Sequence, residues 1–268
     1  MLRLHVLASG SKGNASIVED AHTGRGVLID CGICKRDFLA ACAEVGFDPA
    51  NLAAVFVTHE HTDHTKGMGV VLRGLAKKGI EGVPLYVAPS VLRASKDLQA
   101  VEGLVDVRSM KAGDDVTIPG ASDFAVHVFA TSHDAAASFG FRIGAAADSV
   151  GFMTDTGIVT GEAHEALQHC RILAIEGNHD VRMLENGPYP YALRKRVASD
   201  VGHLSNDQAA EELGALLHDG LEHVVAMHVS ENNNTYDLPV AAMRDVVERA
   251  GCPVSVQSAF QHRVASIG

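Results

Sequence analysis

The chain has 268 residues, of which 47% are hydrophobic and 21% are charged, as in an ordinary globular protein with a substantial core. No apolar run approaches the ~20 residues that a transmembrane helix needs, and the N-terminal stretch reads as a strand rather than a signal peptide. We therefore expect a cytoplasmic location and no membrane association. The net charge of −11 argues against a broad affinity for polyanions but leaves room for a local basic face.

Stretches of strand length alternate with helical patterns, and a β-rich region lies at about 105–154. The predicted strands span residues 2–8, 14–19, 26–30, 53–58, 84–88, 123–131, 138–143, 149–154, 171–176, 223–227 and 253–257. The predicted helices span residues 35–45, 65–78, 159–169, 190–200, 205–218 and 239–250. This order favours an α+β fold of four layers, α/β/β/α, with two mixed β-sheets face to face. No domain boundary is evident, so residues 1–268 are predicted to form a single domain.

Five cysteines are scattered along the chain, and this odd number gives no disulfide framework. Cys31 and Cys34 have CxxC spacing, which also occurs in redox and zinc sites. Because no second pair accompanies them, we favour the simpler interpretation that they are small buried thiols beside the end of a strand.

The densest group of chemically active residues is His59-Glu60-His61-Thr62-Asp63-His64, which follows the predicted strand 53–58. Alternate residues of a tight loop point the same way, so His59 and His61 can face one ion while Asp63 and His64 turn toward a second. Imidazole and carboxylate ligands without a thiolate suit Zn²⁺, Mn²⁺ or Fe. The sequence therefore predicts two divalent metal ions as cofactors.

This motif resembles the HxHxDH signature of the metallo-β-lactamase superfamily, and further motifs follow in that family's order. Asp30 resembles the early aspartate that supports the metal loop, His133 the third histidine, Asp155 the bridging aspartate and His228 the last histidine. The resemblance implies that one metal is held by His59, His61, His133 and Asp155, and the other by Asp63, His64, Asp155 and His228. Taken alone, His133 and His228 would more often be structural, and Thr154-Asp155-Thr156-Gly157 would more often be a capped turn.

Three segments favour phosphodiester cleavage over the other reactions of the superfamily. The segment Gly202–Asn206 is similar to the one that supplies a proton-donating histidine in ribonuclease Z and in cyclic phosphodiesterases of this fold, which implies a catalytic His203 beside a catalytic Asp63. A helix cap with an incidental histidine is the alternative. The glycine-rich segment Ser9–Asn14 and the polar segment His228–Asn234 offer donors for phosphate, although a hairpin or a polar turn explains them equally well. The residues expected to support the ligands or bind phosphate are Asp30, Ser11, Lys12, Asn14, Glu176, Ser205 and Asn232.

Within the superfamily the chain looks most similar to the YycJ (WalJ)-type branch of bacterial DNA exonucleases, through Ser9–Asn14, Glu176–Asp180, Tyr189-Pro190 and Gly202–Asn206. This resemblance implies a dinuclear metal-dependent phosphodiesterase that degrades DNA from 5′ to 3′ in DNA repair. Its partner would be nucleic acid, most simply DNA, and no obligate protein partner is evident. The chain has no room for the additional domain of the β-CASP nucleases and shows no glycine-rich arm of the ribonuclease Z kind.

The basic residues Arg182, Arg194, Lys195 and Arg196 lie between two of these segments and can border the cleft, although a solvated helix face is an equally simple interpretation. Two other functions remain open. One is a small-molecule hydrolase of the same fold, acting on a cyclic phosphodiester, thioester or lactone. The other is a non-enzymatic scaffold, against which the intact ligand motifs argue.

Overall fold

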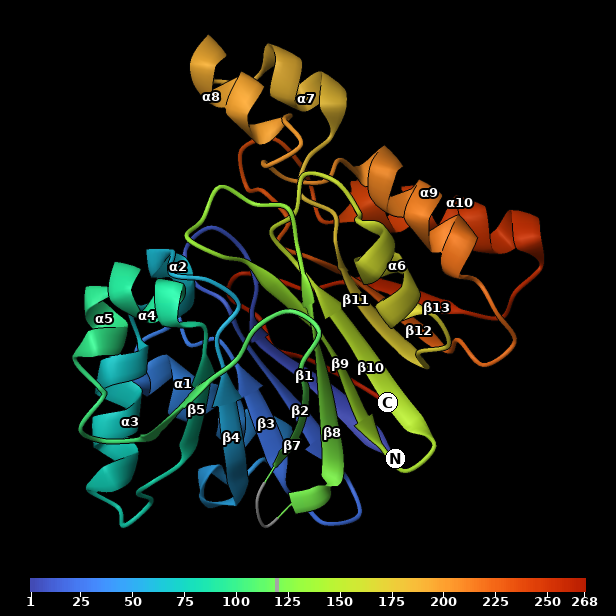
Figure 1. Cartoon of the computed structure of the whole chain (residues 1–268). Helices are drawn as coiled ribbons and strands as arrows, with labels where there is room; N and C mark the ends of the chain where they lie inside the picture. The colour runs from blue at the N-terminus through green and yellow to red at the C-terminus, as the bar shows by residue number, and fades with distance from the viewer. Residues whose placement is uncertain (119–120) are drawn as a thin grey trace.

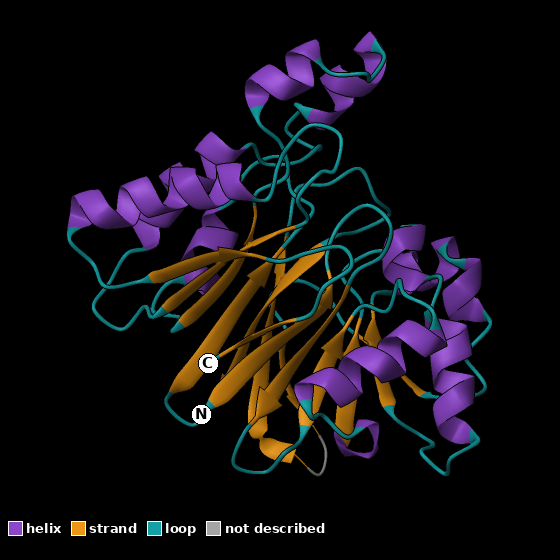
Figure 2. Ribbon diagram, turned by 180° about the vertical axis from the view of Figure 1, so that it is seen from behind, coloured by secondary structure: helices purple, strands orange, loops and turns teal. Residues whose placement is uncertain are grey.

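In the computed structural model, which describes residues 1–118 and 121–268, the chain forms two seven-stranded β-sheets face to face, with helices on both outer faces (Figure 1). The same layers are visible from behind (Figure 2). The predicted four-layer α/β/β/α order is therefore confirmed. One hydrophobic cluster joins side chains of both sheets, while the single domain stays a prediction. Residues 119–120, inside the predicted β-rich region, lie outside the described part.

Each sheet is mixed. In the first sheet, antiparallel strands lie on one side and four parallel strands lie on the other. The first sheet has the strand order β14(Ala265–Ile267), β1(Leu2–Ala8), β2(Ala15–Asp20), β3(Gly26–Ile29), β4(Leu52–Phe56), β5(Pro84–Val87) and β6(Asp106–Ser109). The second has the order β13(Ser255–Ser258), β12(His223–Met227), β11(Ile172–Glu176), β10(Asp148–Met153), β9(Phe139–Ala145), β8(Ala121–Ala130) and β7(Asp115–Ile118), in which β10 to β13 are parallel. The carboxyl ends of the parallel strands therefore meet at one edge of each sheet.

Apolar residues explain why these strands pack as they do. The parallel strand β11 is buried along its whole length, and its apolar run Ile172–Ile175 suits a strand that is covered on both faces. Phe56 on β4 stacks on Tyr86 and meets Phe141 of the opposite sheet edge-on, with ring centroids 4.6 and 5.4 Å apart. Full burial of such a side chain contributes roughly 1.5–3 kcal/mol, so this contact helps to hold the two sheets together.

The helices divide between the two outer faces (Figures 1 and 2). The first sheet is flanked by α1(Lys35–Val45), α2(Thr62–Thr65), α3(Met68–Ala76), α4(Pro89–Ala94) and α5(Lys96–Gln99), and the 3₁₀ turn η1(Pro49–Asn51) precedes β4. The second sheet is flanked by α6(Gly161–Leu167), α9(Asn206–Leu216) and α10(Asp237–Ala250), while α7(Val181–Asn186) and α8(Tyr191–Val197) project beyond the layers. Among the described residues, no helix is long and apolar enough to cross a membrane.

The largest difference from the predicted elements concerns the helix expected at 65–78, which the structure divides into α2 and α3 at Gly67. The Gly67 amide donates to the Cys31 carbonyl at 2.9 Å, and a β-carbon at Gly67 would lie 1.8 Å from the Ile33 carbonyl oxygen. The chain therefore bends here because it packs against the loop after β3. The short elements β6, β7, β14, α4, α5 and α7 were not predicted individually, since three to six residues carry too little periodicity.

The CxxC pair lies in the loop between β3 and α1. Cys31 is fully buried, as expected, whereas Cys34 is exposed at the start of α1, so the expectation of two buried thiols is wrong for Cys34. Burial raises the pKa of the Cys31 thiol well above its ordinary value, and it raises the pKa of Cys42 to about 12.

We therefore predict that iodoacetamide at pH 8 alkylates Cys34 in the native protein, while Cys31 and Cys42 react only after unfolding. Thiolate is the reactive species, and a buried thiol of raised pKa supplies little of it. Peptide mass spectrometry at successive times measures the three rates. Equal rates at Cys31 and Cys34, or a disulfide between them, would contradict the described packing of this loop.

Candidate metal centre

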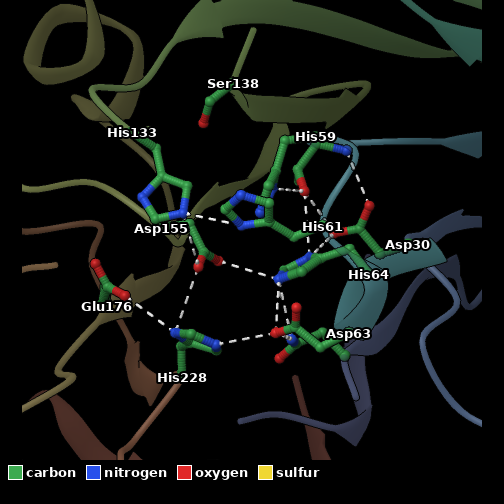
Figure 3. A network of polar contacts seen from close by, with 12 residues as sticks. Asp30, His59, His61, Asp63, His64, His133, Ser138, Asp155, Glu176 and His228 are labelled. Atoms are coloured by element: carbon green, nitrogen blue, oxygen red, sulfur yellow. Dashed lines mark hydrogen bonds and ion pairs between the residues drawn. The ribbon is translucent and has the colours of Figure 1, made fainter. Parts of the chain in front are cut away.

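The predicted metal ligands converge at the edge where strands of both sheets end. The first sheet supplies Asp30, directly after β3, and the loop 59–64, after β4. The second sheet supplies His133 after β8, Asp155 after β10 and His228 after β12. Five loops that are distant in sequence therefore meet between the sheets, and their side chains point toward one another (Figure 3).

The loop after β4 carries three histidines and an aspartate at different depths. His59 and His64 are buried, while His61 and Asp63 are partly exposed. The chain enters α2 directly after His61, so Asp63 and His64 lie in a helical turn and point away from the strand. The loop thus carries His59 on its extended part and both Asp63 and His64 on its helical turn.

Asp30 holds this loop through three hydrogen bonds. Its carboxylate accepts from the Thr58 amide at 2.8 Å, the Thr58 hydroxyl at 2.7 Å and His64 Nδ1 at 2.7 Å. Because Nδ1 of His64 carries the proton, Nε2 keeps its lone pair for the centre. Sequence reasoning missed Thr58, although it directly precedes the motif.

The backbone is strained at three of these positions. Asp30, Asp155 and His228 have φ angles of 56°, 55° and 53°, in the left-handed region that side chains other than glycine rarely adopt. Each such residue costs about 1–3 kcal/mol, and all three lie within two residues of the end of a strand. The strain turns the chain sharply so that each side chain enters the space between the sheets.

The donor atoms gather into overlapping groups, within each of which they lie no more than 4.8 Å apart. One group is on the His61 side of the centre and another on the Asp63 side, and Asp155 lies between them. These groups are His59, His61 and His133; His59, His64 and Asp155; and Asp63, His64 and His228. A fourth group combines Asp155 and His228 with Glu176 and His203.

Asp155 is the shared element of the arrangement (Figure 3). Its Oδ1 lies 3.8 Å from His133 Nε2 and 3.5 Å from His228 Nδ1, and its Oδ2 lies 3.3 Å from His64 Nε2. The carboxylate is 2% exposed, so little water can stabilise its charge. It therefore faces both halves of the centre from a buried position.

Several donor atoms lack the partners that burial demands. Among the described residues, His59 Nε2, His228 Nε2 and Asp155 Oδ2 are buried without a hydrogen bond. His133 Nδ1 donates to the Gly202 carbonyl at 3.0 Å, so its Nε2 lone pair faces His61 Nδ1 at 3.3 Å. An unsatisfied buried polar atom costs about 1–3 kcal/mol, and a cation placed among these atoms would remove that cost. The His/Asp clusters are consistent with a dinuclear metal site.

The electrostatics support the same conclusion. Burial by itself would raise the pKa of Asp155, but His228, His64 and His59 hold it well below its ordinary value. Burial opposes the protonation of His228, yet the carboxylates of Asp155, Asp63 and Glu176 together raise its pKa to about 10. The centre thus attracts positive charge, which either protons or metal ions can supply.

Glu176, at the end of β11, joins the centre to His203. Its Oε1 accepts from His203 Nδ1 at 2.8 Å and from His228 Nδ1 at 3.2 Å, and its Oε2 accepts from the amides of Thr156 at 3.0 Å and Leu204 at 3.1 Å. Although burial opposes ionisation, the charge of His203 and the hydrogen bonds from His203 and His228 lower the pKa of Glu176 to about 2. Glu176 therefore contacts both His203 and the candidate ligand His228.

The Ser9–Asn14 loop reaches the centre through Asn14. The Asn14 amide donates to Asp63 Oδ2 at 3.2 Å and lies 3.0 Å from His64 Nε2, so it positions the Asp63 carboxylate. Lys12 is exposed, and its ammonium pairs with Glu231 at 2.7 Å, which brings the loops 9–14 and 228–234 together.

The other expected phosphate ligands lie farther out. Ser11 is exposed at the tip of its turn. The Ser205 hydroxyl accepts from the Gln208 amide in a capping box, so it begins α9, as predicted for that helix. The Asn232 amide donates to the Tyr189 hydroxyl at 3.2 Å. Phosphate binding by these residues stays a prediction.

One contact near the centre was not anticipated. Asp134 Oδ1 lies 3.6 Å from His133 Nε2, and its other oxygen accepts from the Arg196 guanidinium. In the sequence Asp134 is next to the candidate ligand His133, but its partner Arg196 is 62 residues away. Arg196 belongs to a helix, and hydrophobic periodicity does not reveal where that helix packs.

A comparison with known families accounts for this architecture. The family described as "Beta-lactamase superfamily domain" matches residues 25–229, which include the five loops of the centre. The chain belongs to the metallo-β-lactamase superfamily. As a member with intact His/Asp clusters, it is a metal-dependent hydrolase.

Within this superfamily the chain is related to two curated proteins along nearly its whole length. It is 31% identical to "Exodeoxyribonuclease WalJ" of Streptococcus pneumoniae, over 94% of this chain and 90% of that protein. It is also 31% identical to "Exodeoxyribonuclease YycJ" of Bacillus anthracis, over 93% and 90%. The crystal structure of the metallo-β-lactamase fold protein YhfI from Bacillus subtilis covers 99% of both chains with a TM-score of 0.73 at 16% identity, which supports the fold alone.

We predict that Asp30→Asn weakens the binding of zinc by roughly 10- to 100-fold, because the amide no longer holds His64 as a charged acceptor does. Competition with a chromogenic chelator measures this affinity. Asp37→Asn, at an exposed aspartate of α1, is the matched control and should bind zinc as the wild type does. Wild-type affinity in the Asp30 variant would show that this network does not position the loop.

Proposed function

We propose that the protein is a dinuclear metal-dependent phosphodiesterase that acts as a DNA exonuclease. The two related exodeoxyribonucleases, each matched over about nine-tenths of its length, support the substrate class. Cleavage from 5′ to 3′ and a role in DNA repair belong to the same proposal and follow from the resemblance of the sequence motifs.

The proposal assigns the donor atoms to two ions. One ion would be held by His59, His61, His133 and Asp155, and the other by Asp63, His64, Asp155 and His228. Nitrogen and carboxylate ligands without a thiolate suit Zn²⁺ or Mn²⁺, with Fe as a further candidate. When bound, such ions polarise the phosphate and lower the pKa of water toward neutrality. Asp63, with its carboxylate held by Asn14, would orient the attacking water from the partly exposed side of the centre.

The observation that carries the proposal is the position of His203. Its Nδ1 is bound to the buried Glu176 carboxylate, and its ring lies 5.0 Å from that of His133 and 5.2 Å from that of His228, measured between centroids. Nε2 of His203 is therefore the nitrogen available to donate a proton. An alkoxide leaving group needs that proton, whereas a thiolate does not, so this arrangement favours phosphodiester cleavage over thioester hydrolysis.

Glu176 positions His203 as the proton donor. The carboxylate fixes the tautomer and the direction of the ring, as the orienting acid does in a catalytic triad. Because the same oxygen also accepts from His228, the donor is held at a fixed place relative to the metal centre.

We predict that His203→Ala lowers turnover of an ordinary phosphodiester by roughly 10²- to 10⁴-fold while both metals stay bound. A nitrophenyl phosphodiester, whose leaving group needs little protonation, should lose far less. Steady-state kinetics on both substrates, with metal analysis of each sample, measures the difference. His164→Ala is the matched control, since this histidine pairs with Glu212 on the outer helices. Equal losses on both substrates with the metals retained would contradict the role of His203 as a proton donor.

The substrate class and polarity are tested with end-labelled nucleic acids. Metal-loaded protein should release the label of 5′-labelled DNA at once as a mononucleotide, whereas 3′-labelled DNA should shorten progressively. Gel analysis of single- and double-stranded DNA and RNA distinguishes the classes, and Asp155→Ala serves as the inactive control. Hydrolysis of a cyclic phosphodiester, thioester or lactone without cleavage of any nucleic acid would replace the proposal with a small-molecule hydrolase.

A further inference from the structure

The two short helices α7 and α8 stand apart from both helix layers in both views (Figures 1 and 2). We call residues 181–197 the α7–α8 hairpin. It follows the loop after β11, which carries Glu176, and it ends five residues before Gly202-His203. The amide of His203 donates to the carbonyl of Val197, the last residue of α8, at 2.9 Å. The projection is therefore attached directly to the candidate proton donor.

The charge of the hairpin is opposite to that of the chain. Its basic residues are Arg182, Arg194, Lys195 and Arg196 and its one acidic residue is Glu185, so four positive charges less one negative leave +3, whereas the whole chain carries −11. A local positive surface attracts anionic ligands even on an acidic protein. It lies beside the candidate metal centre, because Arg196 binds Asp134 next to His133.

Two of these cations are already engaged and hold the hairpin in place. The Arg196 guanidinium binds the Asp134 carboxylate beside His133, and the Arg194 guanidinium donates to the Glu185 carbonyl within the hairpin. On the other side, Tyr189 accepts from Asn232. Within the described part of the chain, Lys195 and Arg182 form no ion pair, and both are exposed. These two residues thus provide the free positive charge of the hairpin.

Tyr191 is exposed beside this free charge. It is 69% exposed, and it is the one exposed side chain of the four tyrosines, in a chain without tryptophan. Lys195 lies one helical turn later, with its ammonium 5.7 Å from the centroid of the Tyr191 ring. The exposure of an aromatic ring does not stabilise the fold. A ring with a cation beside it is suited to bind a nucleotide, because the ring stacks on the base and the cation pairs with the phosphate.

We propose that the α7–α8 hairpin binds an unpaired nucleotide at the end of a DNA strand, with its base stacked on Tyr191 and its phosphate paired with Lys195. This inference rests on the proposed nuclease function and specifies the form of DNA that the site accepts. A base inside a duplex is already stacked on both faces, so the ring favours an unpaired base. The link between Val197 and His203 places this nucleotide on the side where the leaving group is protonated.

The test uses metal-loaded protein and a DNA duplex with a single-stranded 5′ overhang, ended by 2-aminopurine and joined by phosphorothioates to slow cleavage. The fluorescence of 2-aminopurine falls when the base stacks. Tyr191→Leu should weaken binding of the overhang by roughly 10- to 100-fold and abolish the quenching, whereas Tyr191→Phe should preserve both. Binding of a blunt duplex should change less than about 3-fold, because phosphate contacts carry it.

The controls separate this inference from the proposed function. Val70→Ala removes an exposed apolar side chain from α3 and should leave overhang binding and quenching unchanged. Metal content and thermal unfolding check that each Tyr191 variant is folded. If wild-type protein degrades DNA but Tyr191→Leu binds and quenches the overhang normally, or loses blunt-duplex affinity equally, the hairpin inference is overturned alone. If wild-type protein neither binds nor degrades DNA, the proposed function fails and this inference fails with it.

Discussion

A buried carboxylate without an adequate partner is the constraint on which the rest of the site depends. Asp155 is 2% exposed, and its Oδ2 has no hydrogen bond among the described residues. An unpaired charge in a protein interior is costly, so its surroundings must supply positive charge. Histidine nitrogens from both sheets surround it, and the strained φ of 55° aims it at them. The contact between the two sheets therefore has an electrostatic role beyond hydrophobic burial.

The same charge organises the surrounding network. Asp30 and Glu176 each accept a hydrogen bond from a ring nitrogen of the centre, Asp30 from His64 of the first sheet and Glu176 from His228 of the second. Each carboxylate fixes a tautomer and leaves the opposite nitrogen for a cation. Because Glu176 also binds His203, the candidate proton donor belongs to the same rigid unit as the donor atoms. Binding and proton transfer are thus linked through one buried side chain.

The sequence predicted the architecture because strands and helices have local signals, whereas His133, Asp155 and His228 were predicted as metal donors only through the resemblance to the superfamily. The run His59–His64 is dense, and Asp155 and His228 each follow an apolar strand, so the shared edge of parallel strands brings them together. The roles of Thr58 and of the pair Asp134–Arg196 depend on which loops meet, and no periodicity encodes that. The projection of α7 and α8 was also hidden, since helices of six and seven residues carry only one or two turns of pattern.

The central claim is that one carboxylate balances two cations, and metal analysis after reconstitution and desalting tests it most directly. The account predicts two equivalents of zinc or manganese per chain in the wild type. Asp63→Ala, which removes a donor from one side, should retain about one equivalent, and Asp155→Ala should retain neither, since both ions depend on that carboxylate. Circular dichroism checks that both variants are folded. A folded Asp155→Ala protein that keeps one or two equivalents would contradict the account.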